Sequence, residues 1–234
     1  TAHVIAGGAL AMAFIPLMSD YLTTQGREAA WDLFSRVANL AFLVTSSIAV
    51  LVFIFAQQIV DHVIVPGFTP EQRALVAELM RLNLISTIIF SISGLVMASL
   101  QANQHFILPA LAPTMYNVGQ IFGAIIFVPI FGLPGLVYGV ILGALLHLGV
   151  QIPALFKFGF QWTPALDLRN TGLLEALKLL GPRLLTMGGI QLIVIARDYL
   201  ASLTGQEGAV TSLAFGWMIM QVPETLLGTA IATA

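Results

Sequence analysis

Apolar residues run through this chain in long blocks that short polar stretches separate. A helix that crosses the hydrocarbon core of a bilayer needs about 20 mostly apolar residues. Read with that window, the pattern predicts seven membrane-spanning helices, near residues 4–22, 37–60, 79–101, 107–131, 133–156, 182–203 and 208–232. Transmembrane strands would read as short alternating segments, and these blocks are too continuously apolar for that. We therefore expect an all-α, polytopic transmembrane helical bundle, with residues 1–234 in one transmembrane domain.

Two connections between these spans have a helical pattern of their own. In residues 27–36 the apolar side chains fall near one helical face and the charges lie elsewhere. Residues 172–180 repeat the arrangement, with Glu175 and Lys178 among leucines. Amphipathic stretches beside membrane spans commonly lie in the interface, so we expect a short interfacial helix in each connection.

Composition and charge agree with a lipid environment. The chain is 58% hydrophobic and 9% charged, against roughly 25% charged residues in a typical soluble domain. A formal net charge of −2 argues against a nucleic-acid partner, because binding phosphates requires a clustered excess of Lys and Arg. Cysteine is absent from the sequence, which excludes disulfides, thiolate metal sites and cysteine nucleophiles.

Basic residues gather on alternate connections. One side carries Arg27, Arg36, Lys157, Arg169, Lys178 and, at a helix mouth, Arg183, and the other carries Arg73 and Arg81. By the positive-inside rule, the 23–36, 102–106 and 157–181 connections face the cytoplasm. The first span then runs from outside to inside, which implies at least one further span upstream. Apolar stretches also reach both ends, so we expect an internal piece of a longer protein.

Glycines recur with helical spacing in the sequence GLVYGVILG. Gly135, Gly139 and Gly143 are four residues apart and therefore share one helix face. Without side chains there, a neighbouring helix can approach closely, so the pattern predicts helix packing. A glycine track that lines a moving interface is the alternative.

Prolines mark places where helices can bend. Pro113 lies in FILPALAPTMYNVGQ with Asn117 one turn later, and Pro223 lies in MIMQVPETLLG. A proline inside a helix removes one backbone hydrogen bond and bends the helix. In transporters such breaks often face the substrate pathway. These three residues are therefore candidates for helix kinks or gating, with a purely structural kink as the alternative.

Ionisable residues inside apolar spans are costly, so each needs a partner or a purpose. Arg197 and Asp198 interrupt the sixth span, and Glu224 interrupts the last. Adjacent helix residues point about 100° apart, so Arg197 and Asp198 need not pair directly. In one interpretation Arg197 snorkels from a helix end towards water. In the other, Arg197, Asp198 and Glu224 face a central cavity, together with Gln191 and Gln221, and handle an anionic headgroup.

The remaining polar residues in the spans indicate structure rather than catalysis. Asn117, Gln120, His147 and Gln151 can join helices through hydrogen bonds, the default for isolated amides in membranes. No H-E-x-x-H, G-x-S-x-G or phosphate-binding loop occurs in the sequence. We therefore expect no enzyme, no cofactor and no metal site. Ions, the membrane potential or a substrate gradient would drive any transport.

Several strings, in order, resemble one family of membrane transporters. They are AGGALAMAFIPLMSDYL, FILPALAPTMYNVGQI, LGALLHLGVQIPALFKFGF, LKLLGPRLLTMGGIQL, LASL and QVPETLLGTAIATA. Together they cover essentially the whole chain and are similar to successive helices of the MurJ/MviN family of the polysaccharide-exporter superfamily, which is related to MATE transporters. The resemblance implies the N-terminal lobe of a two-lobe transporter of roughly fourteen spans, with this chain covering about the second to eighth helices.

The resemblance also implies an activity and a substrate. The expected activity is the movement of lipid II, an undecaprenyl-pyrophosphate-linked disaccharide-pentapeptide, to the outer leaflet of the bacterial cytoplasmic membrane by alternating access. A cationic central cavity would hold the pyrophosphate. No nucleic acid is expected as a partner; membrane lipids are.

Some positions depart from the family pattern. Where members carry Arg before the opening motif and Glu within it, this chain has Ala2, His3 and Gly7. Where many members show Arg and Glu before the last proline, it has Met218 and Gln221. Two alternatives therefore stay open beside the lipid II flippase: another exporter of the superfamily, for drugs or other glycolipids, and a membrane scaffold that keeps the fold without transport.

Overall fold

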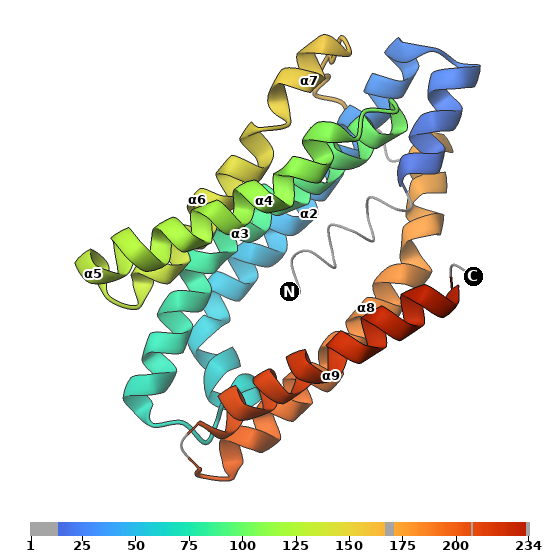
Figure 1. The fold of residues 1–234 in the computed structure, drawn as a ribbon. Coiled ribbons are helices and arrows are strands. Elements are labelled where there is room, and N and C mark those ends of the chain that lie inside the picture. The colour runs from blue at the N-terminus through green and yellow to red at the C-terminus, as the bar shows by residue number, and fades with distance from the viewer. Residues whose placement is uncertain (1–13, 167–170, 207, 233–234) are drawn as a thin grey trace. The chain divides into compact units, whose positions relative to one another are not determined.

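The computed structural model describes residues 14–166, 171–206 and 208–232, and every regular element in these ranges is helical. Residues 14–24 form the first described helical stretch. The elements that follow are α2 (Arg27–Ile59), the π-helical turn η1 (Val60–Ile64), α3 (Pro70–Ala102), α4 (Ile107–Phe122), the π-helical turn η2 (Gly123–Phe127), α5 (Val128–Phe131), α6 (Pro134–Gly149), α7 (Ile152–Lys157), α8 (Thr171–Leu203) and α9 (Ala209–Ala232) (Figure 1). Helices satisfy their own backbone groups, as an apolar solvent demands. The expected all-α fold class is confirmed.

The chain divides into two compact units. The first comprises Thr1–Ala56 and Glu78–Ile190, and the second comprises Gln57–Ala77 and Gln191–Ala234. The first unit contains most of α2 and α3, all of α4 to α7, and the first part of α8. The second contains the α2–α3 connection, the rest of α8, and α9.

Four helical segments of the described chain are long and apolar enough to cross a membrane. They are Arg27–Ile64, Pro70–Ala102, Ile107–Phe131 and Pro134–Lys157. They lie at the positions of four expected spans, and a shorter apolar helix, Ala209–Pro223, lies at the start of the last. The expected span at 182–203 falls within α8, whereas the one at 4–22 begins outside the described residues. The limits of the individual spans stay predictions.

The two amphipathic stretches are not short helices of their own, so that prediction was wrong. Residues 27–36 are the first turns of α2, which continues without a break. Residues 172–180 likewise belong to the start of α8, and Pro182 lies inside that helix without ending it. In α2 the Arg36 Nε lies 2.7 Å from Asp32 Oδ2, one turn earlier. Such an i,i+4 ion pair stabilises α2 near residue 36, where the sequence pattern suggested that a separate short helix would end.

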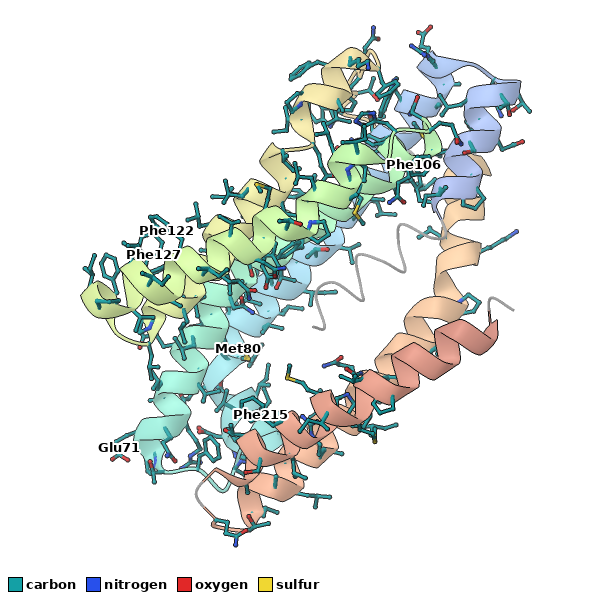
Figure 2. The ribbon with its side chains drawn as sticks, in the orientation of Figure 1. Glu71, Met80, Phe106, Phe122, Phe127 and Phe215 are labelled. Carbon is teal, nitrogen blue, oxygen red and sulfur yellow. The ribbon has the colours of Figure 1, made fainter. Side chains whose placement is uncertain are left out.

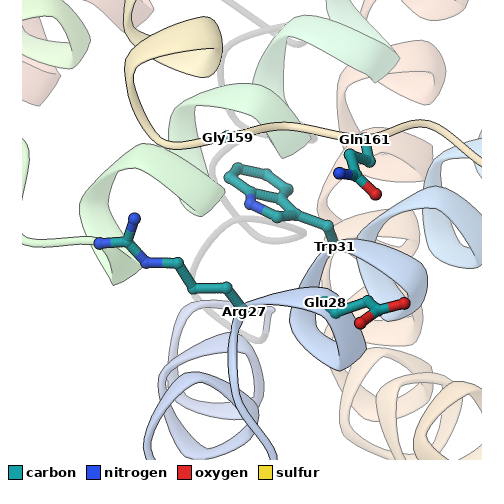
Figure 3. A pocket seen from close by; sticks show the side chains of 5 residues that line it. All are labelled: Arg27, Glu28, Trp31, Gly159 and Gln161. Atoms are coloured by element: carbon teal, nitrogen blue, oxygen red, sulfur yellow. The ribbon is translucent and has the colours of Figure 1, made fainter.

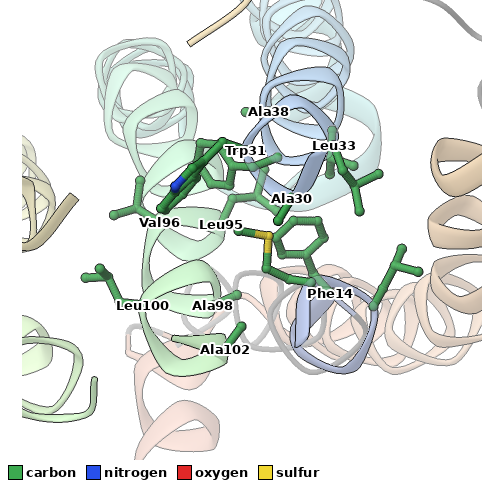
Figure 4. Close-up of a cluster of buried hydrophobic side chains, with 14 of the residues drawn as sticks. Phe14, Ala30, Trp31, Leu33, Ala38, Leu95, Val96, Ala98, Leu100 and Ala102 are labelled. Carbon is green, nitrogen blue, oxygen red and sulfur yellow. The ribbon is translucent and has the colours of Figure 1, made fainter. Parts of the chain in front are cut away.

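The core of the first unit gathers at the N-terminal end of α2. The rings of Trp31 and Phe34 meet edge to face, with centroids 5.6 Å apart. Phe14 meets Phe34 at 6.2 Å, and Phe160, beyond α7, meets Trp31 at 5.3 Å. Leu95 of α3 is fully buried in the same cluster (Figure 4). Edge-to-face contacts add to the stabilisation from burial, so this cluster holds the start of α2 against its neighbours.

Glycines bring α4 and α6 together backbone to backbone. A Cβ on Gly139 would lie 2.6 Å from the Gly123 Cα, and a Cβ on Gly143 would lie 2.6 Å from the Tyr116 carbonyl oxygen. No L side chain fits at that separation, so the two helices need glycine at these positions. Figure 1 shows α4 and α6 side by side along their length. Close helix packing, which the glycine spacing predicted, is confirmed.

At this contact, α4 passes into the π-helical turn η2, which begins at Gly123. Phe122 precedes the turn and Phe127 is its last residue, and their rings meet edge to face at 5.3 Å (Figure 2). Phe131 of α5 makes a similar contact with Tyr138 of α6, also at 5.3 Å. Wider helical turns often mark functional positions or irregular packing. Here the aromatic contacts fix the end of the α4–α6 pair.

Residues 158–166, which follow α7 and form neither helix nor strand, run along α2; we call this segment the strap. Three α2 side chains one turn apart, Trp31, Ser35 and Asn39, bind it. Trp31 Nε1 donates to the Phe158 carbonyl (3.0 Å), and Thr163 N donates to Ser35 Oγ (3.2 Å). Asn39 makes three bonds. Its Nδ2 donates to the Thr163 and Ala165 carbonyls (2.9 and 3.1 Å), and its Oδ1 accepts from Trp162 Nε1 (2.9 Å). Backbone groups that no regular element satisfies are thus paired by one helix face.

Candidate substrate-pathway residues

An ion pair on α8 forms the charged centre of the second unit. Arg197 Nε and Nη2 donate to the same Asp198 oxygen, Oδ1, at 2.9 and 2.7 Å. The two side chains are 21% and 24% exposed. The sequence did not require them to pair, but the long Arg side chain reaches its neighbour despite the angle between them. Because both donors share one oxygen, the pair lacks the two-oxygen fork of the strongest Arg–carboxylate contacts.

The Arg197 guanidinium also contacts α9. Its Cζ lies 6.0 Å from the centroid of the Trp217 ring. A guanidinium near an aromatic face is attracted by the ring quadrupole, more strongly where water is scarce. Trp217 was missed by sequence reasoning, because nothing in the sequence showed that it lies beside Arg197. Arg197 thus joins α8 to α9 and is held on two sides.

The other polar candidates of the second unit are arranged less closely. Gln191 is exposed on α8, and Gln221 is half-buried on α9. Glu224 belongs to α9, but its side chain lies outside the part that the structure describes. A cavity that Arg197 and Glu224 share therefore stays a prediction.

The candidates for kinks lie in helices that continue past them. Pro113 is inside α4 and Pro223 is inside α9, and neither residue ends its helix. In α4 the departure from α-helical geometry comes ten residues after Pro113, at η2. Pro113 and Asn117 are exposed on the first unit, and Pro223 is exposed on the second. Their exposure leaves a pathway or gating role open as a prediction.

A second ion pair of the second unit was not among the candidates. Arg73 Nη1 on α3 lies 3.4 Å from Asp61 Oδ1 in η1, and Gln57 Nε2 donates to the same Asp61 oxygen at 2.9 Å. Arg73 Nε is buried without a hydrogen-bond partner among the described residues. Asp61 and Arg73 lie in the connection between the expected spans 37–60 and 79–101, where charges are ordinary, so no sequence signal singled them out. The pair ties the end of α2 to the start of α3.

A buried polar network joins α3 to the end of α6 in the first unit. Ser93 Oγ lies 2.6 Å from His147 Nδ1, and Gln151 Nε2 donates to Ser93 Oγ at 3.1 Å and to the His147 carbonyl at 2.7 Å. All three residues are buried. The structural role expected for His147 and Gln151 is confirmed. Gln120 differs, since its amide donates to the Tyr116 hydroxyl on its own helix at 3.0 Å.

A small pocket of about 290 Å³ lies where the strap meets α2. Its walls are Arg27, Glu28, Trp31, Gly159 and Gln161 (Figure 3). None of the predicted site residues lines it. Among the described residues, no group of three or more His, Cys, Asp or Glu side chains could hold a metal ion. The two ion pairs and the amide side chains described above are therefore the main polar groups of the apolar helices that the structure describes.

A family model described as Lipid II flippase MurJ matches residues 2–234. The chain belongs to the MurJ family. This membership confirms the family that the ordered strings of the sequence suggested. It also makes the chain part of a family of multi-pass membrane transporters, in agreement with its long apolar helices.

Individual MurJ proteins match along the chain at modest identity. The lipid II flippase MurJ of Burkholderia cenocepacia is 28% identical over 236 residues, which cover 97% of this chain and 45% of the relative. A probable lipid II flippase MurJ of Buchnera aphidicola (subsp. Acyrthosiphon pisum) is 26% identical over 235 residues, with 99% and 46% covered. The chain therefore spans a little under half the length of these relatives.

A solved structure supports the fold. A MOP superfamily transporter from Pyrococcus furiosus superposes with a TM-score of 0.69 at 16% identity, over 95% of this chain and 50% of that one. At this identity the likeness concerns the fold alone. The chain has the fold of one half of a MOP superfamily transporter.

Proposed function

We propose that this MurJ-family protein is a flippase that moves lipid II from the inner to the outer leaflet of the bacterial cytoplasmic membrane in peptidoglycan biosynthesis. The observation that carries the proposal is the family match over residues 2–234. The named relatives are lipid II flippases, or probable ones, along the same residues. In two-lobe transporters, rocking of the lobes around a central site exposes that site to one side of the membrane at a time.

In this proposal Arg197 binds the pyrophosphate of the substrate. Asp198 neutralises Arg197 through one carboxylate oxygen while the site is empty. A pyrophosphate offers several anionic oxygens and so competes well for a guanidinium, which binds phosphate best through two parallel hydrogen bonds. Gln191, Gln221 and Glu224 complete the polar surface, while Pro113, Asn117 and Pro223 permit helix bending. A coupling ion or the membrane potential supplies the driving force.

The test is rescue of a bacterium depleted of its own lipid II flippase, using the complete gene. The expected result is growth together with restored exposure of lipid II on the outer face of the membrane. Arg197→Ala should abolish rescue and Arg197→Lys should weaken it, because Lys lacks the planar fork. Arg81→Ala serves as the control, since Arg81 contacts Phe53 in the first unit instead (Nε to the Phe53 carbonyl, 3.2 Å). No rescue from protein present in the membrane at normal levels would contradict the proposal.

The second candidate function is export of a different substrate, a drug or another glycolipid. It is favoured by Met218 and Gln221, which replace charges that the family resemblance leads us to expect. Met218 is 61% exposed, so the substitution changes an accessible surface of α9. The Pyrococcus relative of this fold is itself described as having a binding pocket of reversed polarity that suggests a different function. Uptake or export assays with cationic drugs in the same strain would separate this candidate from the flippase.

A further inference from the structure

An apolar groove in the first unit is independent of the charged residues above. It has a volume of about 440 Å³ and lies between α2, α3, the α6–α7 corner and the strap. Its lining residues are Phe34, Ala38, Asn39, Phe42, Ile92, Val96, Leu148, Ile152, Leu155, Phe156, Phe160 and Trp162. Ten of these twelve side chains are hydrocarbon only. The groove is therefore an apolar site large enough for part of a ligand.

The two polar side chains of the groove are already satisfied. Asn39 Nδ2 donates to the Thr163 and Ala165 carbonyls, and Asn39 Oδ1 accepts the indole N–H of Trp162. A ligand with polar groups would have to desolvate them here without compensation, at a cost of several kcal/mol per group. The groove thus selects an occupant that has no hydrogen-bonding groups along its length.

Membrane surroundings decide what that occupant is. The rim residues Phe42, Phe156 and Trp162 are 51%, 73% and 59% exposed. From Phe42 the exposed apolar face of α2 continues through Leu43, Val44 and Ile48, in a segment apolar enough to cross a bilayer. The groove is therefore continuous with a lipid-facing surface. At the strap end, Lys157 is exposed beside Phe156, and tryptophan is a residue of the membrane–water interface.

We propose that this groove binds one hydrocarbon chain of an anionic membrane phospholipid. The chain lies against Ala38, Val96 and Leu155. The headgroup lies at the strap end, where the exposed Lys157, whose Nζ lies 5.9 Å from the Phe158 ring centroid outside the groove lining, meets its phosphate. A bound hydrocarbon chain packs continuously against the groove, whereas lipids that move laterally past it would leave the groove poorly packed. The strap, fixed by Asn39, closes one end of the site, so a bound lipid stabilises the connection between α7 and α8.

The test uses the full-length protein in vesicles of phosphatidylethanolamine and phosphatidylglycerol that contain a phosphatidylglycerol tracer with a diazirine within one acyl chain. After illumination, mass spectrometry locates the tracer. We expect labelling around Phe42 and Phe156 to exceed that around Ile130, a side chain on α5 whose exposed fraction lies between theirs, by about fivefold, since a bound chain stays longer than bulk lipid. The readout needs no transport, so its failure would leave the proposed function untouched.

Matched variants make the result specific. Ile152→Trp fills the groove from its rim and should reduce the labelling about fivefold, whereas Leu136→Trp, on a similarly exposed residue of α6 outside the groove, should not. Phe156→Ala, at the most exposed rim side chain, removes one wall without disturbing the core and should also reduce it. Lys157→Glu should weaken labelling by the phosphatidylglycerol tracer but not by a phosphatidylcholine tracer.

Three outcomes would overturn the proposal. Labelling equal to that at Ile130 and unchanged in Ile152→Trp would show ordinary exchanging lipid. No labelling around Phe42 and Phe156, with normal labelling at Ile130, would show that protein covers the groove. Displacement of the tracer by undecaprenyl phosphate, but not by the same amount of dioleoyl phosphatidylglycerol, would assign the groove to a polyprenyl chain instead.

Discussion

Among the described residues, two arginines of the second unit are paired with carboxylates in or beside apolar helices. Arg197 is held by Asp198 and by the Trp217 ring, and Arg73 is held by Asp61. In hydrocarbon the alternative to pairing is an isolated charge that costs several kcal/mol. The pairing of these charges is therefore expected from the apolar environment of the helices alone, and it is also compatible with the substrate-binding role that we propose for Arg197.

The Arg197–Asp198 pair allows a prediction about stability. Asp198→Ala leaves the guanidinium without its counter-charge and should lower the stability of the purified protein by ~1–2 kcal/mol, less than for a fully buried pair because about a quarter of each side chain is exposed. The double variant Arg197→Ala/Asp198→Ala should recover part of that loss. Thermal unfolding in detergent, followed by tryptophan fluorescence, checks both. A double variant less stable than Asp198→Ala would contradict the ion-pair explanation.

The buried network gives a second residue-scale prediction. Gln151→Ala removes the donor to Ser93 and to the His147 carbonyl and leaves a cavity, so we expect a loss of ~1–3 kcal/mol. Gln120→Ala is the matched control, because Gln120 is only half-buried and bonds within its own helix. Thermal unfolding of the two variants side by side is the measurement. Equal losses would mean that the network is not a structural joint.

Several candidate residues could be chosen from the sequence, but their contacts could not. Arg197 and Asp198 stood out because charges interrupt an apolar block. Trp217 did not, because a tryptophan in a span has no unusual cost, and its contact with Arg197 depends on how α9 returns beside α8. Asp61 and Arg73 lie in a connection between two expected spans, where charges are ordinary, so only their contact in the structure singles them out.

At the scale of elements, two devices hold the first unit together. Glycines let α4 and α6 approach each other closely. In the strap, the Asn39 amide binds backbone carbonyls and accepts the Trp162 indole N–H. The close approach of α4 and α6 could be predicted, because glycines four residues apart on a membrane-spanning helix are typical of close helix packing. The second could not, since Asn39 and Thr163 are 124 residues apart and the strap has no periodic pattern. Periodicity also failed at residues 27–36, because it identifies a helix but not where the helix stops.

The contact between Gly139 and Gly123 predicts whether alanine at position 139 raises or lowers the stability of the protein. Alanine favours helices over glycine by about 1 kcal/mol, so Gly139→Ala would stabilise an unpacked helix. Here its Cβ would meet the Gly123 Cα at 2.6 Å, and we expect a net loss of ~1–3 kcal/mol. Gly149→Ala, on the same helix with nothing within 4 Å of its Cβ, should be neutral or stabilising. Melting temperatures that rise for both variants would rule out backbone contact.

The strap predicts a local rather than a global change. Asn39→Ala removes two donated bonds and the acceptor of the Trp162 indole, so amides of residues 158–166 should exchange with solvent about tenfold faster. The rest of α2 should be unaffected. Asn117→Ala, on an exposed amide of α4, is the control. Hydrogen–deuterium exchange of the full-length protein in detergent distinguishes the two, and unchanged exchange in the strap would show that the bonds do not hold it.

At the scale of the whole molecule, the second unit brings the α2–α3 connection against the last turn of α8. A Cβ on Gly67 would collide with the Ser202 carbonyl, and the Gly67 N–H donates to Ser202 Oγ at 3.3 Å. Ser202 is buried by this contact. The positive-inside rule predicts that the α2–α3 connection and this end of α8 lie on the outer side of the membrane. If the protein works by alternating access, a contact between segments so distant in the chain is a natural closing point on that side, and it must loosen when the site opens outwards.

This argument predicts both a topology and a defect. With Ser202→Cys as a reporter, a membrane-impermeant maleimide added outside intact cells should react slowly, because the residue is buried by the Gly67 contact. Adding Gly67→Ala pushes the two backbones apart, so labelling should rise about tenfold and rescue of the flippase-depleted strain should weaken. Gly189→Ala, where a Cβ meets nothing within 4 Å, should change neither result. Labelling only after permeabilisation would invert the topology, and faster labelling with full rescue would show that closure at Gly67 is not part of transport.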